Sequence, residues 1–108
     1  ELAEVESYMP NFEEVIDLIK QKDYENLFYQ FDKSFGADRQ SIEKLFSTVE
    51  NKLGKLNHIY ATGFKNFETK ECGKVIEFKA VLVHDKMAVN MFLCFSKKNR
   101  KLVLLLLP

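Results

Sequence analysis

In the first half of the chain, apolar residues recur every three or four positions, which is the spacing of one face of an α-helix. A first helix is predicted over residues 11–22 from Phe12, Val15 and Ile19. A second, shorter helix follows Asp23, a residue type that favours a helix N-cap. The apolar face of this second helix consists of Tyr24, Leu27, Phe28 and Phe31.

The third apolar repeat predicts the longest uninterrupted helix of the chain. Asp38 or Ser41 would cap its first turn, and Gly54 would end it, because glycine tolerates the backbone conformation that follows a helix. The apolar stripe of this helix consists of Ile42, Leu45, Phe46, Val49 and Leu53. Residues 1–10 are expected to form an N-terminal arm, and residues 11–108 a single domain.

From Leu56 onward, apolar and polar residues alternate, which predicts β-strands. Turn residues at Cys72–Gly73, at Asp85–Lys86 and over 97–101 divide this half into four strands. Tight hairpins at the first two turns would gather on one sheet face Ile59, Ala61, Gly63, Phe67, Ile76, Phe78, Ala80, Leu82, Met87, Val89, Met91, Leu93 and Phe95. The predicted fold class is therefore α+β, with three N-terminal helices packed on a curved four-stranded antiparallel meander sheet.

Two apolar features suggest that the chain associates. The opposite sheet face would carry a patch that includes Phe64, Val81 and Phe92, and the last strand is apolar throughout. A meander leaves that strand at the sheet edge, where long apolar strands tend to pair with other chains. We expect a homodimer or a partner domain to contact Phe64, Val81, Phe92, Leu102, Leu104 and Leu106. Alternatively, the edge curls under residues 1–9.

Composition narrows the function classes. The sixteen basic and sixteen acidic residues cancel, so no net positive field favours nucleic acid, and the basic run 97–101 is expected to be a solvated hairpin loop. The longest apolar run, 102–107, is far shorter than the roughly 20 residues of a transmembrane helix, so we expect no membrane span.

Few residues are candidates for chemistry. His84 and Lys65 interrupt the predicted inner sheet face and, with Tyr60, are candidates for the rim of a pocket, although a rim histidine and a surface lysine explain the same pattern. No metal-ligand spacing and no phosphate-binding glycine motif occurs, so no metal or cofactor is expected. Five aromatic and methionine side chains could either line a pocket for a small apolar ligand or fill the core. They are Phe28, Phe31, Phe46, Phe78 and Met91.

The order of helices and strands resembles the cystatin-like cone of the nuclear-transport-factor-two-like superfamily. Within it, Lys22–Phe28 with Phe31–Asp32, then Leu45–Phe46 and Leu53–Lys55, resembles a bacterial domain-of-unknown-function family whose meander ends in proline, as at Pro108. The chain departs from that pattern at Lys22, at Phe46 and in the last strand. The resemblance implies export or lipid anchoring, or a position ahead of a hydrolase domain.

These observations predict a noncatalytic binding or interaction module, self-associating or accessory to another domain. The alternative is a small-molecule isomerase or dehydratase that uses a base in a pocket between helices and sheet. The predicted inner face carries no Asp or Glu to act as that base, so the sequence favours the binding module.

Overall fold

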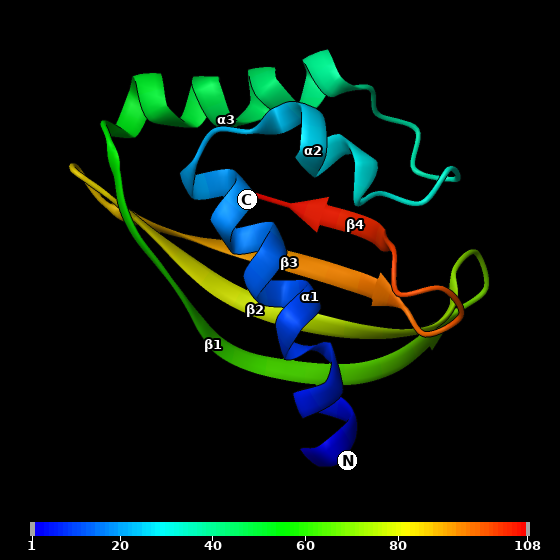
Figure 1. Cartoon of the computed structure of the whole chain (residues 1–108). Coiled ribbons are helices and arrows are strands. Elements are labelled where there is room, and N and C mark those ends of the chain that lie inside the picture. The colour runs from blue at the N-terminus through cyan, green and yellow to red at the C-terminus, as the bar shows by residue number, and fades with distance from the viewer. Residues whose placement is uncertain (1, 108) are drawn as a thin grey trace.

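The computed structural model describes residues 2–107 and shows three helices followed by one four-stranded sheet (Figure 1). The elements are α1 (Leu2–Lys20), α2 (Tyr24–Tyr29), α3 (Arg39–Leu53), β1 (Leu56–Thr69), β2 (Gly73–His84), β3 (Ala88–Ser96) and β4 (Leu102–Leu106). The strands are antiparallel in the order β1-β2-β3-β4, which confirms the predicted α+β class and the meander. Pro108, the last residue of the predicted domain, lies outside the described residues.

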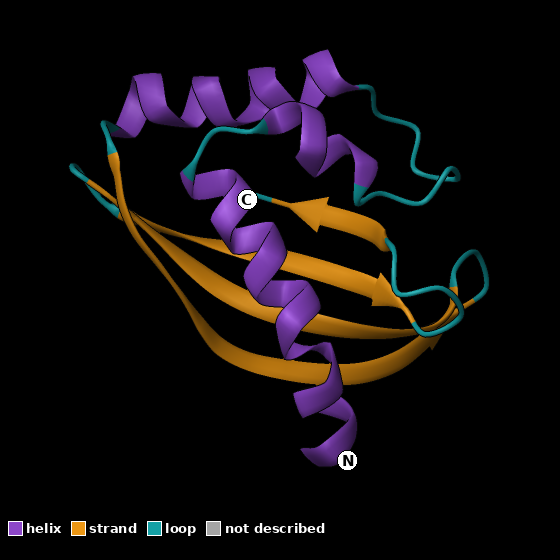
Figure 2. Cartoon of the chain, viewed as in Figure 1, coloured by secondary structure: helices purple, strands orange, loops and turns teal. Residues whose placement is uncertain are grey.

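The helices cover one face of a curved sheet (Figure 2). Helix α1 crosses the sheet, while α2 and α3 lie over β4. Aromatic contacts join the layers: the ring centroids of Phe12 and Phe78 are 4.9 Å apart, and those of Tyr8 and Phe95 are 6.3 Å apart. We call the helix-covered side the inner face and the other side the outer face.

Residues 2–10, expected to form an N-terminal arm, belong to α1, so the predicted start of the first helix at residue 11 is wrong. The apolar stripe of α1 continues backward through Tyr8 to Val5, and both side chains are buried in the core. Pro10 stands inside the helix, where it lacks the N–H that would bond one turn back. Burial of this apolar stripe against the sheet offsets the lost hydrogen bond. Because this stabilisation comes from tertiary packing, local sequence signals do not predict it.

The starts of α2 and α3 and the end of α3 follow the predicted caps, whereas α1 ends at Lys20, two residues before the predicted end. The Asp23 carboxylate accepts a hydrogen bond from the backbone N–H of Asn26, and the Asp38 carboxylate accepts one from that of Ser41. Helix α3 ends at Gly54, as predicted. Local capping chemistry therefore decided where α2 and α3 begin.

The predicted register is confirmed for β2 and β3 and wrong for most of β1. Val75–Val83 pair with Ala88–Ser96 about the turn at Asp85–Lys86, as expected. In β1, however, a bulge at Thr62 shifts the register by one residue. Beyond it, Phe64 pairs with Phe78 on the inner face, whereas Gly63, Lys65 and Phe67 point to the outer face.

The turn between β1 and β2 is also longer than predicted. Thr69 pairs with Gly73, so three residues form the loop instead of two. Gly73 has φ +73°, the left-handed conformation typical of three-residue hairpin loops. The Thr69 hydroxyl accepts a hydrogen bond from the backbone N–H of Cys72 at 2.8 Å, which stabilises the wider turn.

The basic turn between β3 and β4 binds α1. The Arg100 guanidinium donates to the Ser7 carbonyl oxygen at 2.8 Å and lies 4.1 Å from the Tyr8 ring centroid. Lys97 forms an ion pair with Glu4 at 3.0 Å. Lys101 also donates a hydrogen bond to the Tyr29 carbonyl oxygen at 3.1 Å. Much of the basic run therefore contacts the helical layer, which corrects the expected solvated loop.

Candidate functional site

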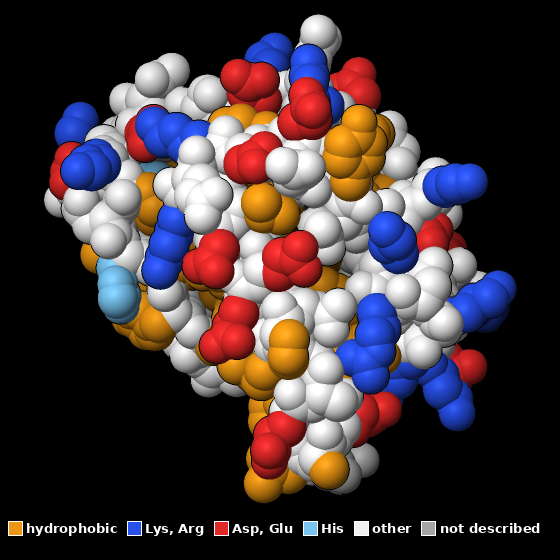
Figure 3. All heavy atoms as spheres, viewed as in Figure 1, with side chains coloured by type: hydrophobic (Ala, Val, Ile, Leu, Met, Phe, Trp, Pro, Cys, Tyr) orange, Lys and Arg blue, Asp and Glu red, His pale blue; other side chains and the backbone are white. Residues whose placement is uncertain are grey.

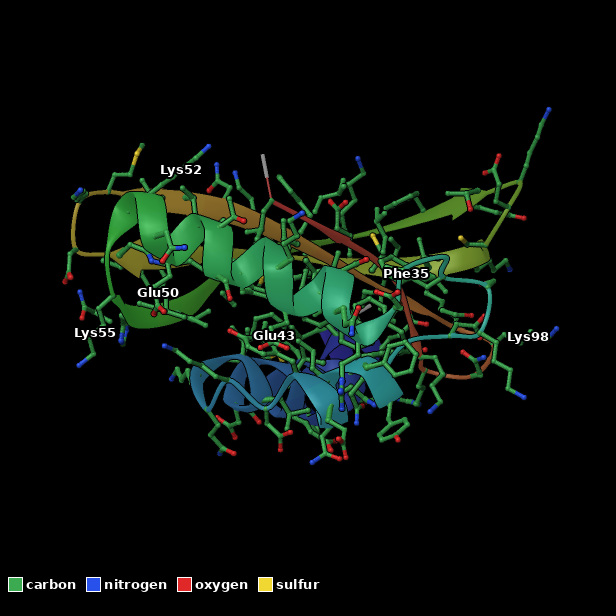
Figure 4. All side chains as sticks on the ribbon, turned by 90° about the horizontal axis from the view of Figure 1, so that it is seen from above. Phe35, Glu43, Glu50, Lys52, Lys55 and Lys98 are labelled. Atoms are coloured by element: carbon green, nitrogen blue, oxygen red, sulfur yellow. The ribbon has the colours of Figure 1, made fainter. Side chains whose placement is uncertain are left out.

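A small recess lies beside His84, at the end of β2 (Figure 4 shows Glu50 and Lys55 at this end of the molecule). Its volume is about 110 Å³. It is lined by Ile19, Lys20, Lys22, Tyr24, Phe46, Glu50, Lys55, Leu56 and His84. All three helices or their ends, together with β1 and β2, thus contribute to one site, and His84, a predicted rim candidate, is a buried residue of its lining.

Four hydrogen bonds, which we call the clasp, hold the two residues that follow His84. The backbone N–H of Lys86 donates to the Leu53 carbonyl oxygen at 2.8 Å, and that of Asp85 donates to the Lys55 carbonyl oxygen at 3.0 Å. In return, the Asp85 carboxylate accepts hydrogen bonds from the Lys55 backbone N–H and from the Asn57 side chain. These four bonds tie the β2–β3 turn to the end of α3.

A hydrogen bond to Gly54 sets the tautomer of His84. Its Nδ1 lies 2.8 Å from the Gly54 carbonyl oxygen, which can only accept a hydrogen bond, so Nδ1 carries the proton. Its Nε2 is buried and has no hydrogen-bond partner among the described residues. When the imidazole is neutral, this nitrogen is a buried acceptor at the wall of the recess.

Charged groups surround this imidazole. Lys22 and Glu50 form an ion pair at 2.8 Å across the recess; their hydrogen bond lowers the pKa of Glu50 and raises the pKa of Lys22 from the ordinary values. Hydrogen bonds from Asn57 and from the Lys55 backbone lower the pKa of Asp85. Burial raises the pKa of Tyr24, so its hydroxyl stays neutral at physiological pH.

Tyr60 lies elsewhere, in an open groove between α1 and the edge strand β1. The groove has a volume of about 520 Å³. It is lined by Met9, Phe12, Glu13, Ile16, Asp17, Lys20, Ile59, Tyr60 and Ala61. Figure 3 shows acidic side chains gathered along α1 beside it. Only Lys20 lines both this groove and the recess, so Tyr60 and His84 belong to different sites.

Lys65 lies on the outer face, which corrects its predicted place on the pocket rim. The Thr62 bulge pairs it with Glu77, and its ammonium group lies 5.3 Å from the Phe67 ring centroid. Next to it is a largely apolar hollow of about 210 Å³. The hollow is lined by Phe67, Thr69, Glu71, Cys72, Val75, Cys94, Val103 and Leu104.

Both cysteines line this hollow as free thiols. Burial, together with the neighbouring Glu77 carboxylate, raises the pKa of Cys94 to about 12. Cys94 is therefore protonated at physiological pH and a poor nucleophile.

The predicted association residues separate into two groups. Leu102 is fully buried, and its backbone pairs with the segment after α2 through the bonds Asp32 N–H to Leu102 O and Leu102 N–H to Gln30 O. Phe64 lies on the inner face. The register places the other predicted residues together on the outer face: Val81, Phe92, Leu104 and Leu106.

The aromatic residues predicted to line a ligand pocket form the core instead. Phe78 and Met91 are at most 2% exposed, and Phe28 packs against the same cluster. Phe31 and Phe46 reach only the margins of two small recesses, of about 60 and 110 Å³. Both volumes fall below the roughly 300 Å³ at which pockets for drug-sized ligands begin.

No family model, curated protein or solved structure matches this chain. Over residues 2–107, no helix is both long and apolar enough to cross a membrane. The same residues contain no group of three or more His, Cys, Asp or Glu side chains placed to hold a metal ion. The site is therefore interpreted from its geometry alone.

The sequence analysis identified His84 but missed its surroundings. Lys22 and Glu50 are 28 positions apart, and Lys55 faces the recess only because the clasp turns the chain there. No local spacing marks these residues as neighbours. The sequence offers one indication that they are neighbours, which is that each stands at or near the end of a predicted helix.

Proposed function

We propose that this chain is a noncatalytic binding module that associates with a second copy of itself through the outer face of its sheet. The observation that carries the proposal is the apolar outer surface formed around the hollow at Phe67 and Leu104 and extended by Phe92 and Leu106. Leu106 is 50% exposed at the sheet edge. Soluble proteins keep few such connected apolar surfaces uncovered.

The charges on this face favour a second copy as the partner. Lys65 lies near the Phe67 ring, and Lys79 lies near the Phe92 ring. Glu77 pairs with Lys65 across the strands and stands two positions before Lys79 in β2. A two-fold interface brings the same surface of both copies together, so a surface with both signs of charge can pair with itself. The net charge of zero also means that two copies do not repel each other over long range.

The alternative function, a small-molecule isomerase or dehydratase, receives less support from the geometry. Such an enzyme needs a pocket that surrounds its substrate and a base within it. The inner face between the helices and the sheet is filled by Phe78, Met91 and their core neighbours. The recess at His84 is too small to surround most organic substrates.

Sedimentation equilibrium over a range of protein concentrations tests the association. We expect the wild-type chain to dimerise and Leu106→Lys to remain monomeric, because a charge would be buried at the interface. Met87→Lys is the matched control: Met87 is 55% exposed in the β2–β3 turn and should not affect association. A wild-type monomer at about 1 mM, or equal loss of dimer in both variants, would contradict the proposal.

A further inference from the structure

The recess at His84 carries an excess of positive charge. Lys20, Lys22 and Lys55 line it together with the Glu50 carboxylate, and the Asp85 carboxylate lies close enough to interact with Lys55 and His84. Lys22 pairs with Glu50, whereas the ammonium groups of Lys20 and Lys55 make no hydrogen bond or ion pair within residues 2–107. A cation is disfavoured by this arrangement, and an anion is favoured.

The unpartnered nitrogen of His84 is the second observation. A buried polar atom without a hydrogen bond costs free energy, so it usually has a partner such as water or a ligand. The hydrogen bond to the Gly54 carbonyl oxygen already uses Nδ1, which leaves Nε2 for that partner. Protonation at Nε2 would make it a charged donor, the form that binds an oxyanion.

We infer that the recess is a binding site for a small oxyanion, held by protonated His84 together with Lys20 and Lys55. The volume of about 110 Å³ suits a few water molecules or one small ion and excludes most larger ligands. Sulfate, phosphate and a carboxylate group share the required chemistry. No residue that lines the recess belongs to the outer apolar surface, so this inference does not depend on the association proposed above.

Binding should strengthen as pH falls, because only the imidazolium form of His84 offers a hydrogen-bond donor at Nε2 while Nδ1 donates to Gly54. The other charged groups near His84 are Lys20 and Lys55 at the lining of the recess, the Lys22–Glu50 ion pair and Asp85 in the β2–β3 turn. Glu50 and Asp85 stay ionised from pH 8.0 to pH 5.5 because hydrogen bonds lower their pKa, and Lys22 stays protonated because its hydrogen bond to Glu50 raises its pKa. Tyr24 stays neutral because burial raises its pKa.

Sulfate is the appropriate probe because its charge is constant over this range. Amide chemical shifts would be followed by NMR during sulfate titration at pH 5.5 and pH 8.0, with ionic strength held constant by sodium chloride. We expect shifts centred on His84, Lys55 and Glu50, and roughly tenfold tighter binding at pH 5.5, since a charge-assisted hydrogen bond forms there.

Four variants separate the contributions. His84→Asn retains a donor for the Gly54 carbonyl oxygen but lacks Nε2, so it should fold and lose the pH dependence. Lys55→Gln should weaken binding, whereas Lys52→Gln, on the other side of α3 from Glu50, should not (Figure 4). Glu50→Gln should strengthen binding, because it removes a carboxylate that lines the recess and would repel the anion.

Two results would overturn the inference. One is the absence of saturable shifts at this end of the molecule at pH 5.5. The other is binding that His84→Asn and Lys55→Gln leave unchanged, which would indicate nonspecific attraction to surface lysines. The dimerisation experiment can succeed or fail independently, because Leu106→Lys changes the outer face and leaves the recess intact.

Discussion

At the scale of single residues, Gly54 determines the geometry of the recess. Its backbone has φ +87° and ψ −170°, a region that only glycine enters readily. A Cβ there would lie 2.7 Å from the Cβ of Asp85, so the clasp closes only because this side chain is absent. The Gly54 carbonyl oxygen then holds His84.

Gly54→Ala should destabilise the protein by about 1–3 kcal/mol, because the substitution adds backbone strain and a contact with Asp85. Urea denaturation followed by circular dichroism measures this change. Gly36→Ala is the matched control, since its φ is ordinary and nothing lies within 4 Å of the added Cβ. If Gly54→Ala and Gly36→Ala were equally stable, the clasp would tolerate a methyl group at position 54, which would contradict this prediction.

At the scale of elements, the bulge in β1 and the anchoring of α1 shape the molecule. Strand β1 follows the curve of the sheet (Figure 1). The extra residue at Thr62 allows this bend and moves Lys65 and Phe67 to the outer face. Helix α1 crosses the sheet and is held at its N-terminal half by the β3–β4 turn. Both features join elements that are distant in sequence.

Arg100→Ala should loosen the N-terminal half of α1, because it removes the hydrogen bond to Ser7 and the contact with the Tyr8 ring. We expect a loss of about 1–2 kcal/mol and faster amide hydrogen exchange in residues 2–9.

Lys98→Ala in the same turn is the control for Arg100, because the Lys98 side chain points away from the molecule (Figure 4). Unchanged exchange in the Arg100 variant, or faster exchange in both variants, would contradict the anchoring role.

At the scale of the whole molecule, Asp32 links the helical layer to the β3–β4 turn. Its carboxylate accepts hydrogen bonds from Ser34 and from the Asn99 side chain, which lower its pKa to about 2. Because the folded-state pKa is depressed, this stabilisation is fully present above the ordinary carboxyl pKa of about 4. It is lost as pH falls from about 4 towards 2.

The stability difference between wild type and Asp32→Asn should therefore be present at neutral pH and shrink over that acid range. Urea denaturation midpoints at pH 7, 4 and 2.5 measure it. Other carboxylates with lowered pKa, such as Asp38 and Asp85, affect both proteins equally, so the difference isolates Asp32. A difference that stays constant from pH 7 to pH 2.5 would rule out this linkage.

The sequence by itself determined the elements whose causes are local. Capping at Asp23 and Asp38, the end of α3 at Gly54 and the tight turn at Asp85 each depend on residues within a few positions, and all are present in the structure. The tight β2–β3 turn also fixed the register that follows it, so the end position of His84 was predictable.

Tertiary structure alone decided the rest. Residues 2–10 became helical because Val5 and Tyr8 are buried against distant strands. The Thr62 bulge depends on how β1 fits the curved sheet, and one extra residue reverses every side chain beyond it. The recess gathers Lys22, Glu50 and His84 from separate elements, and such contacts depend on packing that no short sequence window contains.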